Sequence, residues 1–135
     1  MENVFDKNNS FVGYQSLIEF YGCNPSLIDD ADFVKKTLLK VAEIVELTVV
    51  NCTIHHFSPI GVSGVVVIEE SHIAVHTWPE YQYIALDFFT CNQQFNLEKG
   101  LSFLKKAFEA NQIEQKNIKR GEMNKMHQFA QKTKN

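Results

Sequence analysis

The chain has 135 residues, of which 44% are hydrophobic and 21% are charged, and its formal net charge at pH 7 is −3. This composition fits one globular domain with a single core, excludes a disordered or low-complexity protein, and lacks the basic excess that holds the phosphates of a nucleic acid. The N-terminus has no basic start followed by an apolar run, and no stretch approaches the roughly 20 apolar residues of a membrane span, so we expect a cytoplasmic protein without membrane contact.

The regular elements are predicted from apolar spacing and from residue type. Apolar residues at spacings of three and four indicate helices, and runs of β-branched and aromatic residues between turn residues indicate strands. We expect an α+β fold, an antiparallel β-sheet with two helices packed on one face, and we write its order as β-α-β-β-β-α-β. The polar, aperiodic ends are expected to be mobile. In chain order, the ranges are about 1–10 (mobile), 15–21 (strand), 32–46 (helix), 48–57, 64–70, 72–76 and 83–90 (strands), 97–108 (helix), 113–119 (short strand) and 121–135 (mobile).

Polar side chains concentrate in and beside the most strand-like segments. If residues 72–76 are extended, side chains alternate, and His72 and His76 share one face of the strand. From the residues alone, these two imidazoles are either solvent-facing strand residues or a metal pair; third and fourth ligands are not evident, so we predict no metal site. The whole cluster contains Ser63, Glu69, Glu70, Ser71, His72, His76, Glu80, Asp87 and Cys91.

The three cysteines, Cys23, Cys52 and Cys91, form no CxxC pair, and an odd number cannot pair completely within one chain. The sequence therefore indicates neither a zinc cluster nor a disulfide framework. Taken singly, each cysteine is interpreted as a small buried hydrophobic residue.

The block GVSGVVVIEESHIAVHTWPEYQYIALDFFTC, residues 61–91, resembles the core of the short bacterial and archaeal S-adenosylmethionine decarboxylases, which depend on a pyruvoyl group. The hallmark of that family is ESH followed by HTWPE and then FTC, and here serine, histidine and cysteine keep both identity and spacing. The similarity extends more weakly from residue 13 to about residue 121, and includes EFYGC at 19–23 and HHFSP at 55–59.

The resemblance implies an inactive precursor that cuts its own backbone between Glu70 and Ser71. The hydroxyl of Ser71 attacks the carbonyl of Glu70 and replaces an amide by a less stable ester, so the step needs backbone strain or a donor near the oxyanion. In the family, that donor is the serine that matches Ser63. The histidine that matches His76 then removes the α-proton of Ser71, and elimination followed by hydrolysis leaves a covalent pyruvoyl group.

The implied products are a β chain of residues 1–70 and an α chain of residues 71–135 that begins with pyruvoyl. In the family, the ketone of this group condenses with the substrate amine to a Schiff base, which draws electrons from the bond to the carboxylate. The cysteine that matches Cys91 then returns a proton to the substrate carbon. A thiol suits this task because it is mostly protonated at pH 7 yet able to give up its proton.

The resemblance also implies how the substrate is bound. Glu80 accepts hydrogen bonds from the ribose hydroxyls of S-adenosylmethionine, and Phe57 stacks on its adenine. From the residues alone, the alternatives are that Phe57 is a core residue and that Glu80 is an exposed turn residue. Trp78 is assigned to packing around the turn. The implied activity removes carbon dioxide from S-adenosylmethionine and gives the aminopropyl donor of spermidine and polyamine biosynthesis. The implied assembly is a homodimer of cleaved protomers.

Two positions differ from the family pattern. Gln15 stands where the family usually has a histidine two residues after a glycine, and Asn92 stands where a glycine usually follows the cysteine. Asparagine tolerates a left-handed backbone, so Asn92 is compatible with the same turn. Gln15 bears on substrate contacts more than on self-processing.

The position of Gln15 leaves an alternative substrate open, because some relatives decarboxylate arginine or ornithine with the same pyruvoyl chemistry. The presence of Phe57 and Glu80 favours the nucleoside substrate. A third hypothesis, a non-catalytic partner subunit, predicts loss of the serine, histidine or cysteine of the motif, and all three are present.

Overall fold

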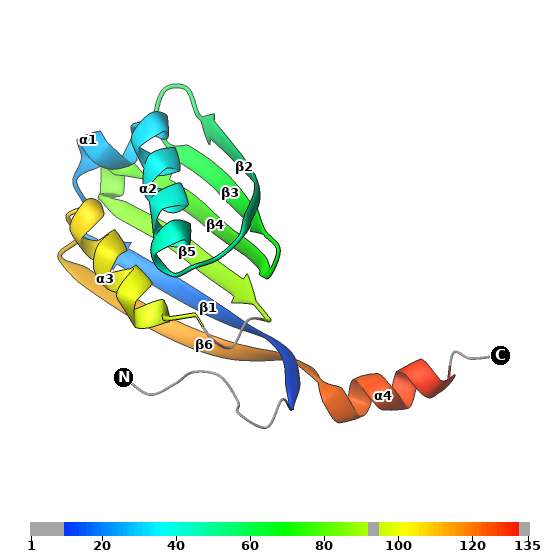
Figure 1. The fold of residues 1–135 in the computed structure, drawn as a ribbon. Coiled ribbons are helices and arrows are strands. Elements are labelled where there is room, and N and C mark those ends of the chain that lie inside the picture. Colours follow the sequence, from blue (N-terminus) through cyan, green and yellow to red (C-terminus); the bar gives the residue numbers. More distant parts are fainter. Residues whose placement is uncertain (1–9, 92–94, 133–135) are drawn as a thin grey trace.

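The computed structural model describes residues 10–91 and 95–132, and these form one antiparallel six-stranded sheet in the order β2-β3-β4-β5-β1-β6. Helices α2 and α3 lie side by side over one face of this sheet (Figure 1). The strands are β1 (Phe11–Tyr21), β2 (Val49–His56), β3 (Val62–Ile68), β4 (Ser71–Trp78), β5 (Tyr83–Thr90) and β6 (Gln112–Glu122); the helices are α1 (Pro25–Ile28), α2 (Ala31–Ile44), α3 (Leu97–Ala107) and α4 (Met123–Lys132), with a 3-10 turn η1 (Pro79–Tyr81).

Both covering helices begin at a side-chain cap and bury an apolar stripe. The carboxylate of Asp30 accepts the N–H of Phe33 at 3.1 Å at the start of α2, and Asn96 accepts the N–H of Lys99 at 3.0 Å at the start of α3. The stripes pack on alternate residues of the central strands, which leaves the other row of each strand on the opposite face of the sheet. The buried core includes Val34, Leu38, Val41, Leu101 and Leu104 from the helices and Ile73, Val75, Ile84 and Phe88 from the sheet.

The α+β class, the antiparallel sheet and the two helices on one face are confirmed. The written order β-α-β-β-β-α-β omits one strand: four strands, β2 to β5, lie between α2 and α3, in agreement with the four predicted ranges 48–57, 64–70, 72–76 and 83–90. Strands β3 and β4 are separated by only Glu69 and Glu70, so the polypeptide reverses direction with little turn signal in its composition. In the described residues, no helix is long and apolar enough to cross a membrane.

The ends of the described chain are more regular than the sequence indicates. Strand β1 begins at Phe11, four residues earlier than expected, because it pairs with β6 over nearly its whole length. The segment after residue 121, predicted to be aperiodic and mobile, contains the helix α4, which extends away from the sheet (Figure 1). Its apolar residues Met123, Met126 and Phe129 recur every three positions, a pattern too short to stand out among polar neighbours.

Candidate active site

The predicted cleavage junction lies at the tight turn between β3 and β4, where Glu70 is followed by Ser71, the first residue of β4. The carbonyl oxygen of Glu70 accepts a hydrogen bond from the backbone N–H of Cys91 at 3.2 Å and from its thiol at 3.5 Å. Glu70 and Cys91 are 21 positions apart in sequence and meet because Ser71 pairs with Thr90 across β4 and β5. Strand pairing therefore gathers the predicted nucleophile, the carbonyl that it attacks and the predicted proton donor.

A second set of predicted residues meets further along β4. Ser63 on β3 is paired with His76 on β4, and the Ser63 hydroxyl oxygen lies 2.8 Å from Nδ1 of His76. These two residues line a cavity of about 400 Å³ together with Phe57, Trp78 and Glu80. The cavity opens on the sheet face away from α2 and α3, because His76 and Trp78 alternate with the buried side chains of β4.

Within one chain, the predicted site residues therefore lie in two separate groups. Ser71 and His76 are five residues apart on the extended strand β4, which at about 3.3 Å per residue separates their Cα atoms by about 16 Å. An imidazole cannot span that distance. We call Glu70, Ser71 and Cys91 the junction group, and Phe57, Ser63, His76 and Glu80 the pocket group.

Residues 14–121 match the family model described as S-adenosylmethionine decarboxylase. The chain belongs to this family. It is 46% identical over 115 residues to the S-adenosylmethionine decarboxylase proenzyme of Acidithiobacillus ferrooxidans, covering 85% of this chain and 86% of that protein. It is 41% identical over 110 residues to the proenzyme of the same name from Pyrococcus abyssi, covering 82% and 79%.

The fold of a solved relative agrees with this membership. The crystal structure of the adenosylmethionine decarboxylase from Aquifex aeolicus superposes with a TM-score of 0.74 at 25% identity, covering 83% of this chain and 92% of that chain. These relatives are named for S-adenosylmethionine, so the comparisons give no support to the arginine or ornithine alternative.

The structure shows whether Phe57, Glu80 and Trp78 lie in the core, in the turn or at the cavity. Phe57 is 46% exposed and is therefore not a core residue of this chain. Glu80 is exposed on η1, as an ordinary turn residue would be, and also lines the cavity. Trp78 lines the same cavity and stacks on Tyr83 with ring centroids 5.4 Å apart. The sequence interpretation missed Trp78 as a cavity wall, because it ended the strand at residue 76 and assigned Trp78 to the turn, whereas β4 continues to Trp78 and places it on the same face as His76.

The remaining histidine of the motif belongs to a polar network on β1, β4, β5 and β6. Nε2 of His72 lies 2.9 Å from Oδ2 of Asp87, which also accepts the Gln15 amide at 3.4 Å. Arg120 in turn donates to the Gln15 side-chain oxygen at 2.6 Å. His72 is thus engaged with a carboxylate, and in the described residues no cluster of three or more metal-ligating side chains includes it or His76. Gln15 contacts this network and is not among the residues that line the cavity.

The three cysteines lie in different environments. Cys23 is 1% exposed, and burial raises the pKa of its thiol to about 11, in agreement with its interpretation as a buried hydrophobic residue. Cys52 is half-buried, and burial raises its pKa as well, with Lys35 opposing the shift. Cys91 is exposed beside the junction. Asn92, the second departure from the family pattern, lies outside the described residues.

Proposed function

We propose that this chain is the proenzyme of a pyruvoyl-dependent S-adenosylmethionine decarboxylase that cuts itself between Glu70 and Ser71. The observation that carries the proposal is the position of Cys91, whose N–H and thiol both contact the carbonyl oxygen of Glu70 at the predicted junction. The relatives named proenzymes support it. The product, decarboxylated S-adenosylmethionine, would serve as an aminopropyl donor for polyamines.

The donors at the junction suit formation of a pyruvoyl group from Ser71. When the Ser71 hydroxyl attacks the Glu70 carbonyl, negative charge develops on the oxygen that Cys91 already contacts, and donors placed on such an oxygen lower the barrier. Ser71 has a φ of 157°, at the edge of the extended region. We therefore assign the lowering of the barrier to the N–H and thiol of Cys91 and not to backbone strain. Once formed, the pyruvoyl group supplies the electron sink for loss of carbon dioxide. The thiol of Cys91 holds the proton that returns to the substrate carbon.

We further propose that the complete site is shared by two copies of the chain. His76 is the base for the α-proton of Ser71, yet about 16 Å of strand separates the two residues in one chain. A homodimer resolves this distance if the pocket group of one subunit faces the junction group of the other. The sheet face away from the helices supports such an assembly, because it presents a set of half-exposed apolar side chains: Tyr21, Val67, Trp78 and Ile118.

The pocket group suits the nucleoside end of S-adenosylmethionine. A cavity of about 400 Å³ is in the range of small-molecule sites. The exposed ring of Phe57 provides a stacking face for adenine, and the Glu80 carboxylate accepts hydrogen bonds from ribose hydroxyls. The ring of Trp78 beside them offers a π face to the sulfonium cation.

Intact-mass analysis and a carbon dioxide assay test the proposal together. The purified protein should consist of fragments 1–70 and 71–135, the second resistant to Edman sequencing because it carries no amine. Labelled carbon dioxide should be released from S-adenosylmethionine, and not from arginine or ornithine offered in parallel. A fully active chain that remains uncut would disprove self-cleavage, and release from arginine or ornithine alone would disprove the substrate.

A further inference from the structure

The loop of residues 57–61 joins β2 to β3 and forms one wall of the cavity. Phe57, Ile60 and Gly61 all line it. The loop closes on itself through a hydrogen bond from the N–H of Phe57 to the carbonyl of Gly61 at 2.7 Å. Gly61 has a φ of +110°, a conformation that residues with a Cβ rarely adopt. The loop is thus a closed unit, and its position relative to the sheet depends on what holds its two ends.

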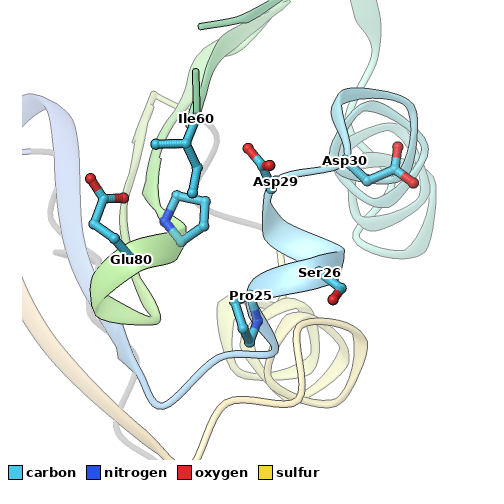
Figure 2. A pocket seen from close by; sticks show the side chains of 7 residues that line it. Pro25, Ser26, Asp29, Asp30, Ile60 and Glu80 are labelled. Carbon is cyan, nitrogen blue, oxygen red and sulfur yellow. The ribbon is translucent and has the colours of Figure 1, made fainter. Parts of the chain in front are cut away.

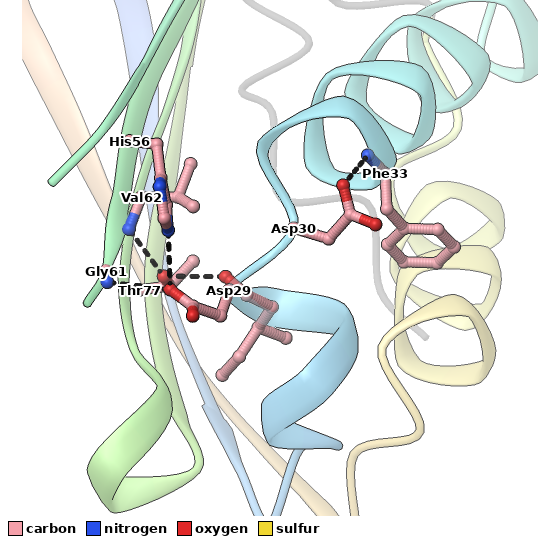
Figure 3. A network of polar contacts seen from close by, with 8 residues as sticks. Asp29, Asp30, Phe33, His56, Gly61, Val62 and Thr77 are labelled. Carbon is pink, nitrogen blue, oxygen red and sulfur yellow. Dashed lines mark hydrogen bonds and ion pairs between the residues drawn. The ribbon is translucent and has the colours of Figure 1, made fainter. Parts of the chain in front are cut away.

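Asp29, at the corner between α1 and α2, holds both ends of this loop. A single carboxylate oxygen, Oδ1, accepts the N–H of Gly61 at 2.8 Å and lies 2.9 Å from Nε2 of His56, the residue before the loop (Figure 3). The Gly61 N–H holds the pKa of Asp29 below its usual value, burial opposes the shift, and His56 adds to it. The ionised carboxylate is therefore the form that the loop stabilises.

The corner that carries Asp29 has its own attachment to the sheet. The buried hydroxyl of Thr77 donates to the carbonyl of Ile28 at 2.9 Å and accepts the N–H of Val62 at 2.9 Å (Figure 3). This bridge lies in the core, whereas the bonds of Asp29 lie near the surface. Removing the Asp29 carboxylate therefore removes the contacts between the loop and the helical corner. The Thr77 bridge keeps that corner in place, and the pairing of His56 with Val62 keeps β2 and β3 together.

Asp29 also lies in a second hollow, of about 440 Å³, which adjoins the cavity. Ile60 and Glu80 line both hollows, and Figure 2 shows Ile60 between the side chains of Asp29 and Glu80. A loop released from Asp29 has open space to move into on this side. The side chain of Ile60 separates the two spaces only as long as the loop is held.

We propose that Asp29 is a positioning residue for substrate binding, which fixes the loop 57–61 so that Phe57 and Ile60 present a preformed wall to the adenosine group. The physical basis is preorganisation. A loop that is already ordered loses little conformational entropy when the substrate binds, so the affinity is higher. This inference rests on the proposed assignment of the cavity to the nucleoside end of the substrate. Asp29 is not among the residues that line the cavity and does not belong to the junction group, so we expect it to act on binding and not on chemistry.

The first test measures KM and kcat for S-adenosylmethionine on cleaved enzyme. Asp29→Ala should raise KM about tenfold and leave kcat within about twofold, because the hydrogen bonds of a charged acceptor are lost. Asp29→Asn should return KM to within about threefold of the wild type, since its amide oxygen still accepts from Gly61. His56→Ala removes one of the two contacts of the Asp29 carboxylate and should raise KM about threefold. Because His56 is exposed, this variant still tests the proposal if Asp29→Ala folds poorly.

The matched control is Asp30→Ala. Asp30 is the adjacent carboxylate, lines the same second hollow and also accepts a backbone N–H, but that N–H belongs to Phe33 at the start of α2 (Figures 2 and 3). Its loss should lower thermal stability and leave KM unchanged. Self-cleavage should be complete in every variant. An equal rise of KM in Asp30→Ala and Asp29→Ala would overturn the proposal.

The second test measures equilibrium binding and separates this inference from the assignment of the cavity. Trp78 is the single tryptophan of the chain and lines the cavity, so its fluorescence should report binding of 5′-methylthioadenosine, which has no amino group to react. Asp29→Ala should weaken this binding about tenfold. If Phe57→Ala weakens binding and Asp29→Ala does not, only the inference is overturned; if Phe57→Ala has no effect, the cavity assignment and the inference are overturned together.

Discussion

The carbonyl oxygen of Glu70 and the residue Cys91 are joined by two contacts, one from the backbone N–H at 3.2 Å and one from the thiol at 3.5 Å. The residue that the family resemblance assigns to turnover thus also contacts the carbonyl oxygen at the proposed cleavage junction. The two contacts respond differently to substitution, because the N–H remains whatever side chain is present. Substitutions of this side chain should therefore separate maturation from turnover.

The variant Cys91→Ser tests this separation. It conserves size and keeps the N–H donor to Glu70, so self-cleavage should slow by less than about tenfold. Its hydroxyl is a far weaker acid than a thiol, so decarboxylation should fall by about a hundredfold or more. Misdirected protonation should convert the pyruvoyl end into alanine, which N-terminal sequencing of the 71–135 fragment would detect as turnover proceeds. Wild-type turnover without alanine would remove Cys91 from the reaction.

The pair Ser63 and His76 should act at different stages of maturation, although their side chains lie 2.8 Å apart. His76→Ala should stall after the acyl shift, because elimination of the ester lacks its base. Hydroxylamine should then cleave the stalled protein at the junction, as denaturing mass spectrometry would show. In the proposed shared site, the Ser63 hydroxyl of the facing subunit is a further donor to the oxyanion, as the family resemblance implies. Ser63→Ala should therefore slow formation of the ester itself and give less hydroxylamine-sensitive material. A His76→Ala protein that is inert to hydroxylamine would place His76 before the acyl shift or outside the chemistry.

The cysteines should differ in reactivity toward iodoacetamide at pH 7.5. The thiolate is the reactive form, and with a pKa of about 11 the thiol of Cys23 is ionised in about one molecule in a thousand or fewer. Cys23 is also only 1% exposed, so the reagent cannot reach it. Cys23 should stay unmodified until the protein is unfolded, while the exposed Cys91 is alkylated and decarboxylation is lost in parallel. Peptide mass mapping over time distinguishes the two. Alkylation of Cys23 in a protein that remains folded and active would contradict the buried assignment.

The carboxylate of Asp29 should contribute to stability at neutral pH and not in acid. Its pKa in the folded state is lowered by the Gly61 N–H, so the contribution is complete above the unfolded value near 3.9 and is lost as pH falls through the folded value. The side chain is 32% exposed, so we expect less than about 1 kcal/mol. The difference in unfolding free energy between wild type and Asp29→Asn should shrink as the pH falls below 4, and the measurement is made in the His56→Ala background so that the charge of the imidazole does not contribute. A difference that is independent of pH would contradict the shift.

Sequence reasoning succeeded where local pattern decides the outcome. The β-branched runs located the central strands. The roles of the residues in the junction group and the pocket group come from the family resemblance and stay predictions. The separation of Ser71 from His76 was implicit in the expected strand 72–76, since five extended residues span about 16 Å. It went unrecognised because a family motif describes an assembled site and does not state which subunit supplies each residue.

The features that escaped prediction depend on contacts between distant parts of the chain. Asp29 and Gly61 are 32 positions apart, and their hydrogen bond requires the exact arrangement of a helical corner and a loop that no periodicity encodes. Gln15 was known to differ from the family pattern, but its role became visible only when β1 paired with β5 and β6 and placed it between Asp87 and Arg120.

The shared site predicts that two inactive variants restore each other. Ser71→Ala disables the junction group and His76→Ala disables the pocket group, so a heterodimer contains one site with both groups intact. When the two are coexpressed equally, about half of the dimers are mixed and each has one competent site of two, which gives about a quarter of the wild-type activity. The His76→Ala chain should be the one that cleaves, and a size tag on one variant identifies it by mass.

The matched control for this rescue is coexpression of Ser71→Ala with Cys91→Ala. Both changes fall in the junction group, so every mixed dimer lacks a complete site whichever way the subunits face. Carbon dioxide release should therefore stay at the level of the two variants expressed alone, while the first pair reaches about a quarter of wild type. If neither pair shows rescue although mixed dimers form, each site is built within one chain, and β4 must then rearrange before cleavage to bring His76 to Ser71. If both pairs show rescue, the activity does not come from the proposed arrangement of junction and pocket groups, and the proposal of a shared site loses its support.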